Sequence, residues 1–387
     1  MNTFILEDKA QVFIRNYKGD TTSLAFKGSP FTHITTAELI TQIEGFRKSE
    51  KKLPCWHKTE GIYFPNKINL EQCSSEITAK YKASLLSGAS LADITGGFGV
   101  DGFYFSKQFN TFFHFEHDQN LSDIAAHNFK VLEVENAETY CEDGIKAIEN
   151  RTFDVIYADP ARRHASKGKV FFLKDCEPDI VRELDYLMER CQTLLLKTSP
   201  MLDISAALAD LKFVKDIHIV AVKNEVKELL WVLDKRCKGE IRIITQNFDN
   251  SGSQEFSITM QQEASNRYDL PQKYLYEPNA ALMKAGNLDV LSNSFGIGKL
   301  HQHSHLFTSN ELKNFPGRVF QIKEVIPYQK KNMAVFKNTK ANVTIRNFPE
   351  DVATLRKKWR ISDGGDDYLF FTTNMNNERI VLKCQKA

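Results

Sequence analysis

The chain of 387 residues has no long hydrophobic run and no paired cysteine motif. No apolar stretch approaches the roughly 18 residues that a membrane-spanning helix needs. The first nine residues, Met1–Lys9, lack the basic region and long apolar stretch of a signal peptide. The seven cysteines are scattered and none forms a Cys-x-x-Cys pair, which argues against a zinc site or a disulfide framework. We therefore expect a cytoplasmic protein with reduced cysteines, no metal and no membrane partner; the oligomeric state stays open.

Charge is nearly balanced overall, with a formal net charge of +2, but it is unevenly distributed. Residues 313–360 contain 12 Lys and Arg against 3 Asp and Glu, whereas the rest of the chain contains 39 against 46. A basic block on a mildly acidic body is typical of a nucleic-acid-binding appendage. The alternative is an ordinary solvated surface, and charge alone does not decide between the two.

The segment Leu91–Gly102, with the sequence Leu-Ala-Asp-Ile-Thr-Gly-Gly-Phe-Gly-Val-Asp-Gly, predicts a buried strand, a tight glycine turn and the start of a helix. Gly96, Gly97 and Gly99 allow the backbone to bend and to approach a ligand closely. The acidic residue, Asp93, precedes the glycines, whereas a dinucleotide fingerprint has its acid about 20 residues later. This order favours S-adenosylmethionine (SAM), which has no pyrophosphate.

Strands and helices alternate between about residues 88 and 236, which predicts a parallel sheet flanked by helices. The last two expected strands are joined only by residues 223–228, a link too short for a parallel crossover, so the last strand should be reversed. Upstream, residues 1–86 look mainly helical, with a break at Lys51–Pro54 and a helix led by Asn69 and Gln72 as a capping box. We expect four domains: residues 1–86, 87–238, 239–321 and 322–387.

Four carboxylates fall at the ends of successive expected strands. Asp93 can anchor the ammonium of the methionine moiety, and Glu116 can accept hydrogen bonds from both ribose hydroxyls. Asp143 can accept a hydrogen bond from the adenine amino group, and Asp159 lies where substrate would meet the methyl group. Each one alone is equally explained as a helix cap or turn residue. Together, behind a glycine turn, they predict a SAM site.

These segments resemble motifs I to IV of class I SAM-dependent methyltransferases; the matching stretches are Asp93–Asp101, Phe115–Asp118, Glu142–Gly144 and Tyr157–Arg163. One departure is Thr95, which stands where the usual pattern has its first glycine. The whole chain is similar to a bacterial family, seen chiefly in Bacteroidetes, in which this domain precedes a ferredoxin-like module and a THUMP-like domain. The later matches are Tyr276–Ala280, Phe315–Arg318, Lys340–Pro349 and Asp363–Asp366. The resemblance implies a Rossmann-like α/β sheet with a reversed last strand, an N-terminal helical domain and a C-terminal α+β region.

The expected catalytic mouth, Tyr157–Arg163, departs from the pattern of base-amino methyltransferases. These usually carry Pro-Pro and an aromatic residue after the acid, and the aromatic residue stacks on a flipped base. Arg162 and Arg163 instead offer forked donors for phosphate or carboxylate, unless they are plain surface residues. Lys82, Asp159, Lys197 and Glu228 are similar in order and location to the Lys-Asp-Lys-Glu tetrad of RNA ribose 2′-O-methyltransferases. A lysine with a depressed pKa would help a ribose hydroxyl to react.

The C-terminal lysines and arginines are interleaved with Tyr328, Phe336, Phe348 and Trp359. Such a surface would contact phosphates and stack on exposed bases, unless the aromatic residues form the core of a small domain. The leading hypothesis is therefore a SAM-dependent methyltransferase of a structured RNA, tRNA or rRNA. The alternatives are a small-molecule or protein methyltransferase, and a non-catalytic RNA-binding protein on a methyltransferase scaffold.

Overall fold

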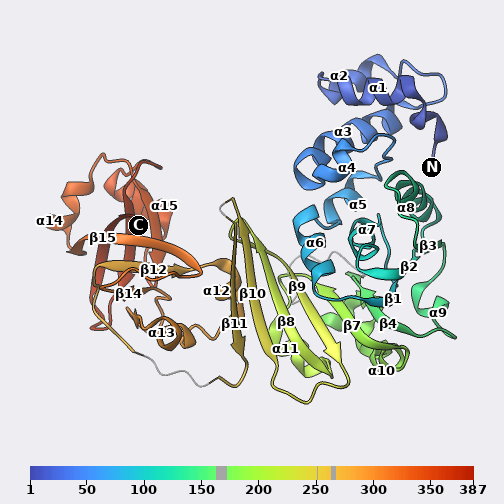
Figure 1. Cartoon of the computed structure of the whole chain (residues 1–387). Helices are drawn as coiled ribbons and strands as arrows, with labels where there is room; N and C mark the ends of the chain where they lie inside the picture. The colour runs from blue at the N-terminus through green and yellow to red at the C-terminus, as the bar shows by residue number, and fades with distance from the viewer. Residues whose placement is uncertain (163–171, 251, 263–266) are drawn as a thin grey trace. The chain divides into compact units, whose positions relative to one another are not determined.

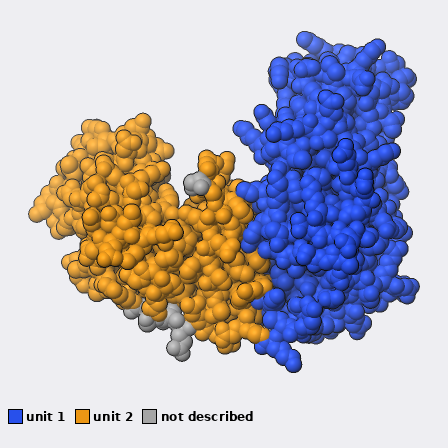
Figure 2. Space-filling model, viewed as in Figure 1, with its two compact units in different colours: residues 1–215, 230–238 blue, residues 216–229, 239–387 orange. Residues whose placement is uncertain are grey.

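The computed structural model describes residues 1–162, 172–250, 252–262 and 267–387. The chain forms two compact units, one made of residues 1–215 and 230–238 and the other of residues 216–229 and 239–387 (Figure 2). None of the helices in these ranges is both long and apolar enough to cross a membrane.

The first 84 residues form short helices, as predicted: η1 (Thr3–Leu6), α1 (Asp8–Asn16), α2 (Thr21–Lys27), α3 (Thr36–Lys52), α4 (Pro54–Lys58), α5 (Lys67–Gln72) and α6 (Glu76–Ser84) (Figure 1). Thr35 and Glu38 form a capping box at the start of α3. The predicted break is present, because α3 ends at Lys52 and Pro54 opens α4, where its missing N–H costs nothing.

The predicted capping box of Asn69 and Gln72 is wrong, because both residues lie inside α5. The side chain of Asn66 caps α5 instead, accepting from the Asn69 N–H at 3.0 Å. A second helix, α6, begins after a break and is capped by Ser75. Side-chain oxygens at the two true N-caps thus decide where the helices start.

A nine-stranded sheet follows, in the order β11-β10-β8-β9-β7-β4-β1-β2-β3 (Figure 1). Its strands are β1 (Gly88–Asp93), β2 (Phe109–Phe115), β3 (Ala137–Tyr140), β4 (Phe153–Ala158), β7 (Cys191–Thr198), β8 (Val214–Val222), β9 (Glu225–Asp234), β10 (Arg242–Asp249) and β11 (Gly252–Thr259). Strand β1 pairs in parallel with β2 and β4, and β4 pairs in parallel with β7. The central strands β4 and β7 are mostly buried and apolar, as expected for parallel strands covered on both faces. The predicted Rossmann-like sheet is confirmed.

Helices and minor elements connect these strands: α7 (Val100–Phe105), α8 (Gln119–Val131), α9 (Gly144–Ala147), β5 (Ala161–Arg162), η2 (Leu173–Asp175), β6 (Cys176–Glu177), α10 (Ile180–Arg190) and α11 (Ile204–Asp210). The reversed last strand has a local cause. Lys223 and Asn224 alone join β8 to β9, and both have positive φ, 52° and 61°. Two such residues make a hairpin turn whose twist suits antiparallel strands.

Strands β10 and β11 form an antiparallel hairpin that belongs to this sheet. Strand β10 pairs in parallel with β8 from Arg242 to Phe248, so the hairpin extends the sheet instead of standing apart. Sequence spacing reveals that two strands form a hairpin, whereas the edge to which a hairpin adds depends on tertiary packing.

The C-terminal part forms a seven-stranded sheet in the order β13-β14-β12-β15-β18-β17-β16. Its strands are β12 (Tyr274–Pro278), β13 (Gly298–Lys299), β14 (Phe307–Ser309), β15 (Gly317–Pro327), β16 (Asn342–Arg346), β17 (Tyr368–Thr373) and β18 (Arg379–Lys386). The helices are α12 (Ala280–Ala285), α13 (Val290–Phe295), α14 (Lys330–Met333), η3 (Ala334–Phe336) and α15 (Val352–Trp359). Strands β16 and β17 are parallel, with α15 as their crossover.

The C-terminal aromatic residues belong to the core. Phe336 is buried, and Tyr328, Phe348 and Trp359 pack against the same cluster of apolar residues. Of the two interpretations that the sequence left open for these rings, base stacking and core packing, the structure supports core packing. A small domain has few large side chains with which to fill its interior, and it uses these.

Glu277 links three segments of the C-terminal part. Its carboxylate is buried, and it accepts hydrogen bonds from Arg318 Nε at 2.7 Å and from Arg346 Nη2 at 2.8 Å. Gly317 lies so close that an added Cβ would sit 2.1 Å from the Glu277 carbonyl oxygen. One buried carboxylate thus holds β12, β15 and β16 by charge-assisted hydrogen bonds.

Replacing Glu277 with Ala should lower the free energy of unfolding by about 2 kcal/mol, because two guanidinium groups lose their anion. This is below the value for a fully buried pair because both arginines are partly exposed. Thermal unfolding of the full chain measures it. The matched control is Glu311→Ala, which breaks an exposed pair with Lys313 and should leave the free energy of unfolding nearly unchanged. Equal losses in both variants would contradict a special role for Glu277.

Candidate cofactor and acceptor site

Asp93 closes strand β1 after the buried residues Leu91 and Ala92. Its side chain is itself buried, and Oδ1 accepts hydrogen bonds from the backbone N–H of Thr95 at 3.0 Å and from its hydroxyl at 3.3 Å. Burial first, and then the charges of Asp101 and Asp159, raise the pKa of Asp93 well above its usual range. A cation placed beside this carboxylate would favour its charged form and so offset both effects.

The glycine turn rests directly on strand β2. The Gly96 N–H donates to the Phe115 carbonyl at 2.8 Å, and an added Cβ on Gly96 would lie 2.3 Å from the ring of His114. Only glycine fits at such a distance. Gly97 and Gly99 have positive φ, 59° and 84°, which a side chain would strain. The predicted use of all three glycines therefore has a steric basis in each case.

His114 lies buried beneath this turn, and neither ring nitrogen makes a hydrogen bond that satisfies normal geometry among the described residues. Burial lowers the pKa of His114 to about 4. The ring is therefore neutral near pH 7, and the glycine turn packs against it.

Glu116 follows β2 and bonds to the turn. Oε2 accepts from the Gly97 N–H and Oε1 from the Asp118 N–H, each at 2.8 Å. The side chain is largely buried, and exposed His117 lies 3.2 Å from Oε1. A carboxylate has about four lone-pair positions, so acceptor capacity remains for a ligand, chiefly on Oε2. Glu116 thus shapes the turn and keeps acceptor capacity beside it.

Thr95 joins the ends of β1 and β4. Its hydroxyl donates to Asp93 and accepts from the backbone N–H of Asp159 at 2.7 Å. The residue that departs from the family's glycine pattern is thus the one that connects two predicted site residues. The sequence signal was a hydroxyl two residues after the strand-end acid, a position from which it can reach back to that acid.

Asp159 and Lys197 form an ion pair at the carboxyl ends of β4 and β7. The Lys197 side chain is 12% exposed and that of Asp159 is 36% exposed, so the pair borders on solvent. Its position allows an incoming group to reach both charges. The structure thus brings together the two residues that the sequence placed in the mouth.

Lys82 is fully buried in α6 and lies close to Asp101. Its Nζ donates to Ser74 Oγ at 3.0 Å and lies 3.3 Å from Asp101 Oδ1. Asp101 Oδ2 accepts from Ser74 and from the Tyr157 hydroxyl, each at 2.9 Å. Burial alone would raise the pKa of Asp101, but the ammonium groups of Lys82 and Lys197 lower it below its usual value. Sequence reasoning assigned no role to Asp101 or Ser74.

Asp143 caps the short helix α9. Its Oδ1 accepts from the Ile145 and Lys146 N–H groups at 3.0 and 3.3 Å, and its side chain is exposed. The next residue, Gly144, packs so tightly that a Cβ would lie 2.2 Å from the Ile94 carbonyl oxygen. The loop after β3 therefore lies against the loop after β1.

The remaining predicted site residues are placed only in part. Glu228 is buried in β9, within the second compact unit. The backbone of Arg162 forms the short strand β5 and pairs with Cys176. Arg163 lies outside the described residues. The roles of these three in substrate binding or catalysis stay predictions.

Two protein-family models match the C-terminal part of the chain. The ferredoxin-like domain family matches residues 274–316, and the THUMP domain-like family matches residues 317–386. A search of curated proteins finds no match.

One solved structure aligns over nearly the full length. It is a proposed methyltransferase from Porphyromonas gingivalis W83, with 30% identity and a TM-score of 0.87 over 98% of this chain and 99% of that one. An rRNA methylase from Streptococcus thermophilus matches 41% of this chain and 94% of its own, at 14% identity and a TM-score of 0.31, which is too distant to carry an argument. With the P. gingivalis protein as a full-length relative, the chain belongs to the Bacteroidetes-type family of class I methyltransferases with a C-terminal ferredoxin-like module and a THUMP-like domain.

Proposed function

We propose that the protein is a SAM-dependent methyltransferase that modifies a structured RNA, tRNA or rRNA. The observation that carries the proposal is the pair of buried carboxylates, Asp93 and Glu116, at the carboxyl ends of adjacent strands with the glycine turn between them. In open α/β sheets this end of the strands is where ligands bind.

The residues fit SAM in charge and in hydrogen-bonding capacity. Asp93 is a buried anion with a raised pKa, and its Oδ2 accepts no hydrogen bond from the described residues, so the ligand's ammonium group would stabilise its charged form. Glu116 keeps acceptor capacity for the ribose hydroxyls, because its two oxygens each accept one backbone hydrogen bond. Asp143 keeps Oδ2 for the adenine amino group. When bound, SAM supplies an electrophilic methyl group on a sulfonium.

The acceptor is expected at the Asp159–Lys197 pair. In methyl transfer the acceptor atom bonds to the methyl carbon as the carbon–sulfur bond breaks, and the acceptor's own proton leaves to a base. Asp159 would orient or accept that proton, and Lys197 would stabilise negative charge that develops on the acceptor. Arg162 and Arg163 follow directly in the chain and would hold a phosphate of the substrate.

Further residues contact Lys82, one member of the proposed tetrad. Lys82 lies against Asp101 and Ser74, and Asp101 in turn bonds to Tyr157, two residues before Asp159. Through Asp101 and Tyr157, Lys82 would help to position the residues at the mouth. Glu228 as the fourth member stays part of the proposal.

RNA is the favoured substrate because of the C-terminal part. The THUMP-like match covers residues 317–386. The described structure shows no ion pair for the exposed basic residues Lys330, Lys331, Lys337, Lys340, Lys357 and Arg360. Uncompensated positive charge attracts phosphates.

Calorimetry with SAM tests the cofactor, and Glu116→Gln tests its contacts. The wild-type protein should bind SAM, and the variant should bind it about ten- to a hundredfold more weakly, the worth of charged hydrogen bonds. Glu135→Gln, at an exposed position, is the matched control and should bind as wild type. Lack of SAM binding by the wild type would overturn the enzyme proposal.

Mass spectrometry of nucleosides from a deletion strain then tests whether RNA is the substrate: a missing methylated nucleoside is expected.

Asp159→Asn should lower turnover about 10²- to 10⁴-fold, the range for a lost general acid or base, with little change in SAM affinity. Methyl transfer from labelled SAM to RNA of the deletion strain measures turnover. Asp185→Asn removes a carboxylate from an exposed Asp–Lys pair and should be silent. Full activity of Asp159→Asn would place the mouth elsewhere.

Thr95→Val should lower kcat about tenfold, because the loss of one hydrogen bond to Asp93 and one to the Asp159 backbone lets the two strand ends drift apart. The KM for RNA should stay near the wild-type value. Thr95→Ser keeps the hydroxyl and should restore kcat. If Thr95→Ser were as slow as Thr95→Val, the methyl group and not the hydroxyl would be what matters.

A further inference from the structure

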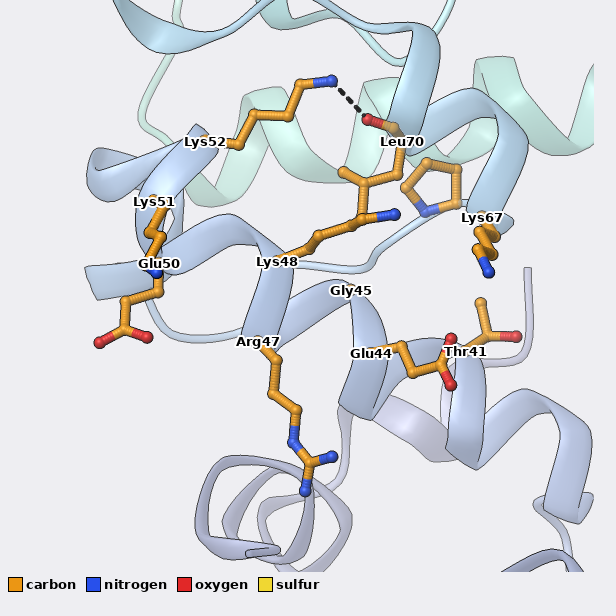
Figure 3. A pocket seen from close by; sticks show the side chains of 11 residues that line it. Thr41, Glu44, Gly45, Arg47, Lys48, Glu50, Lys51, Lys52, Lys67 and Leu70 are labelled. Carbon is orange, nitrogen blue, oxygen red and sulfur yellow. Dashed lines mark hydrogen bonds between the residues drawn. The ribbon is translucent and has the colours of Figure 1, made fainter. Parts of the chain in front are cut away.

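A cleft of about 760 Å³ lies in the N-terminal helical region, along α3 and the start of α5 (Figure 3). Positive side chains dominate its lining: Arg47, Lys48, Lys51, Lys52 and Lys67. The cleft lies within the first compact unit, as do Asp93, Asp159 and Lys197. The predicted domain scheme assigned this region no role in binding.

Two of these cations are held by carbonyl groups. Arg47 Nη2 donates to the carbonyl oxygens of Tyr17 at 2.9 Å and Gly19 at 2.7 Å. Lys52 Nζ donates to those of Leu70 at 2.8 Å and Glu71 at 2.7 Å, and Figure 3 shows the bond to Leu70. Carbonyl oxygens orient an ammonium or guanidinium group but leave its charge uncompensated.

Lys51 and Lys67 are exposed, and within the described ranges neither has a carboxylate within ion-pair distance. Lys48 is the lining cation that forms an ion pair, with Glu71. The lining also contains two carboxylates, Glu44 and Glu50. Five positive and two negative charges make the cleft a site for an anion.

The cleft lies within electrostatic range of the expected mouth: burial first, and then nearby ammonium groups that include Lys197, lower the pKa of Lys52. Four residues after Leu70, at the break between α5 and α6, lies Ser74. Ser74 bonds to both Lys82 and Asp101, the buried pair next to Tyr157. These bonds connect the segment that follows the cleft, between α5 and α6, to the residues beside Tyr157 and Asp159.

We propose that this cleft binds the phosphodiester backbone of the RNA next to the nucleotide that is methylated. The inference rests on the proposed function. It assigns to the helical region the contact with nearby phosphates, while the THUMP-like domain supplies a separate contact. Four of the five lining cations have no ion pair among the described residues, and the five are spread along α3 and the start of α5, which suits a run of phosphates better than a single small anion.

The double variant Lys51→Glu/Lys67→Glu tests this in the full chain. Bulk tRNA is the probe, because phosphate contacts are independent of sequence. The variant should bind tRNA at least about tenfold more weakly, and the slope of log K against log salt should shrink by about 0.7 for each lost contact. SAM affinity and the circular dichroism spectrum should stay unchanged, since neither lysine contacts the strand ends.

The matched control is Lys9→Glu/Lys130→Glu, which changes net charge equally at exposed positions of the same unit. Its tRNA affinity should fall much less. Equal losses in both variants would show a general charge effect and overturn the cleft, as would wild-type binding by the first variant. As an independent check, tRNA should protect Lys51 and Lys67 of the wild-type protein from acylation, and absence of protection counts against the cleft. Failure of the wild type to bind SAM or methylate RNA instead overturns the proposed function.

Discussion

The close approach of the glycine turn to strand β2 is the constraint on which the site depends. Gly96 lies against the buried ring of His114, and successive N–H groups of the turn donate to the Phe115 carbonyl and the Glu116 carboxylate. Any side chain at position 96 would lift the turn off the strand. The depressed pKa of His114 belongs to the same constraint, since an imidazolium ion there would have no anionic partner.

From that contact the arrangement of charge follows. Asp101 has Lys82 beside it, and Asp159 has Lys197, whereas the described residues show no ion pair for buried Asp93. An unpaired buried carboxylate is costly unless a cation arrives. A cationic ligand bound at the end of β1 would therefore stabilise the charged form of Asp93. The Thr95 hydroxyl hydrogen-bonds to both that carboxylate and the backbone N–H of Asp159, so the positions of the two residues are coupled.

Much of this site was predictable because a strand end is a local feature of sequence. Asp93, Glu116, Asp159 and Lys197 each follow an apolar run, and parallel pairing then gathers them at one edge. Asp101 and Ser74 escaped prediction because their bonds join segments far apart along the chain. For the aromatic residues of the C-terminal domain the sequence left two interpretations open, base stacking and core packing. Their sequence pattern suits both stacking and packing, and only the domain's small interior decides.

The net charge of a sequence segment is a poor guide to which of its residues are available to bind phosphate. The C-terminal block stands out in the sequence because its positive charges are clustered along the chain. The helical region does not, because acidic residues such as Glu44, Glu50 and Glu71 are interspersed among its lysines along the chain. The cations of the cleft differ in their hydrogen-bond and ion-pair partners. Arg47 and Lys52 donate to carbonyl oxygens. Lys51 and Lys67 have no carboxylate partner among the described residues. Positive charge that the fold positions without neutralising it remains available to a ligand.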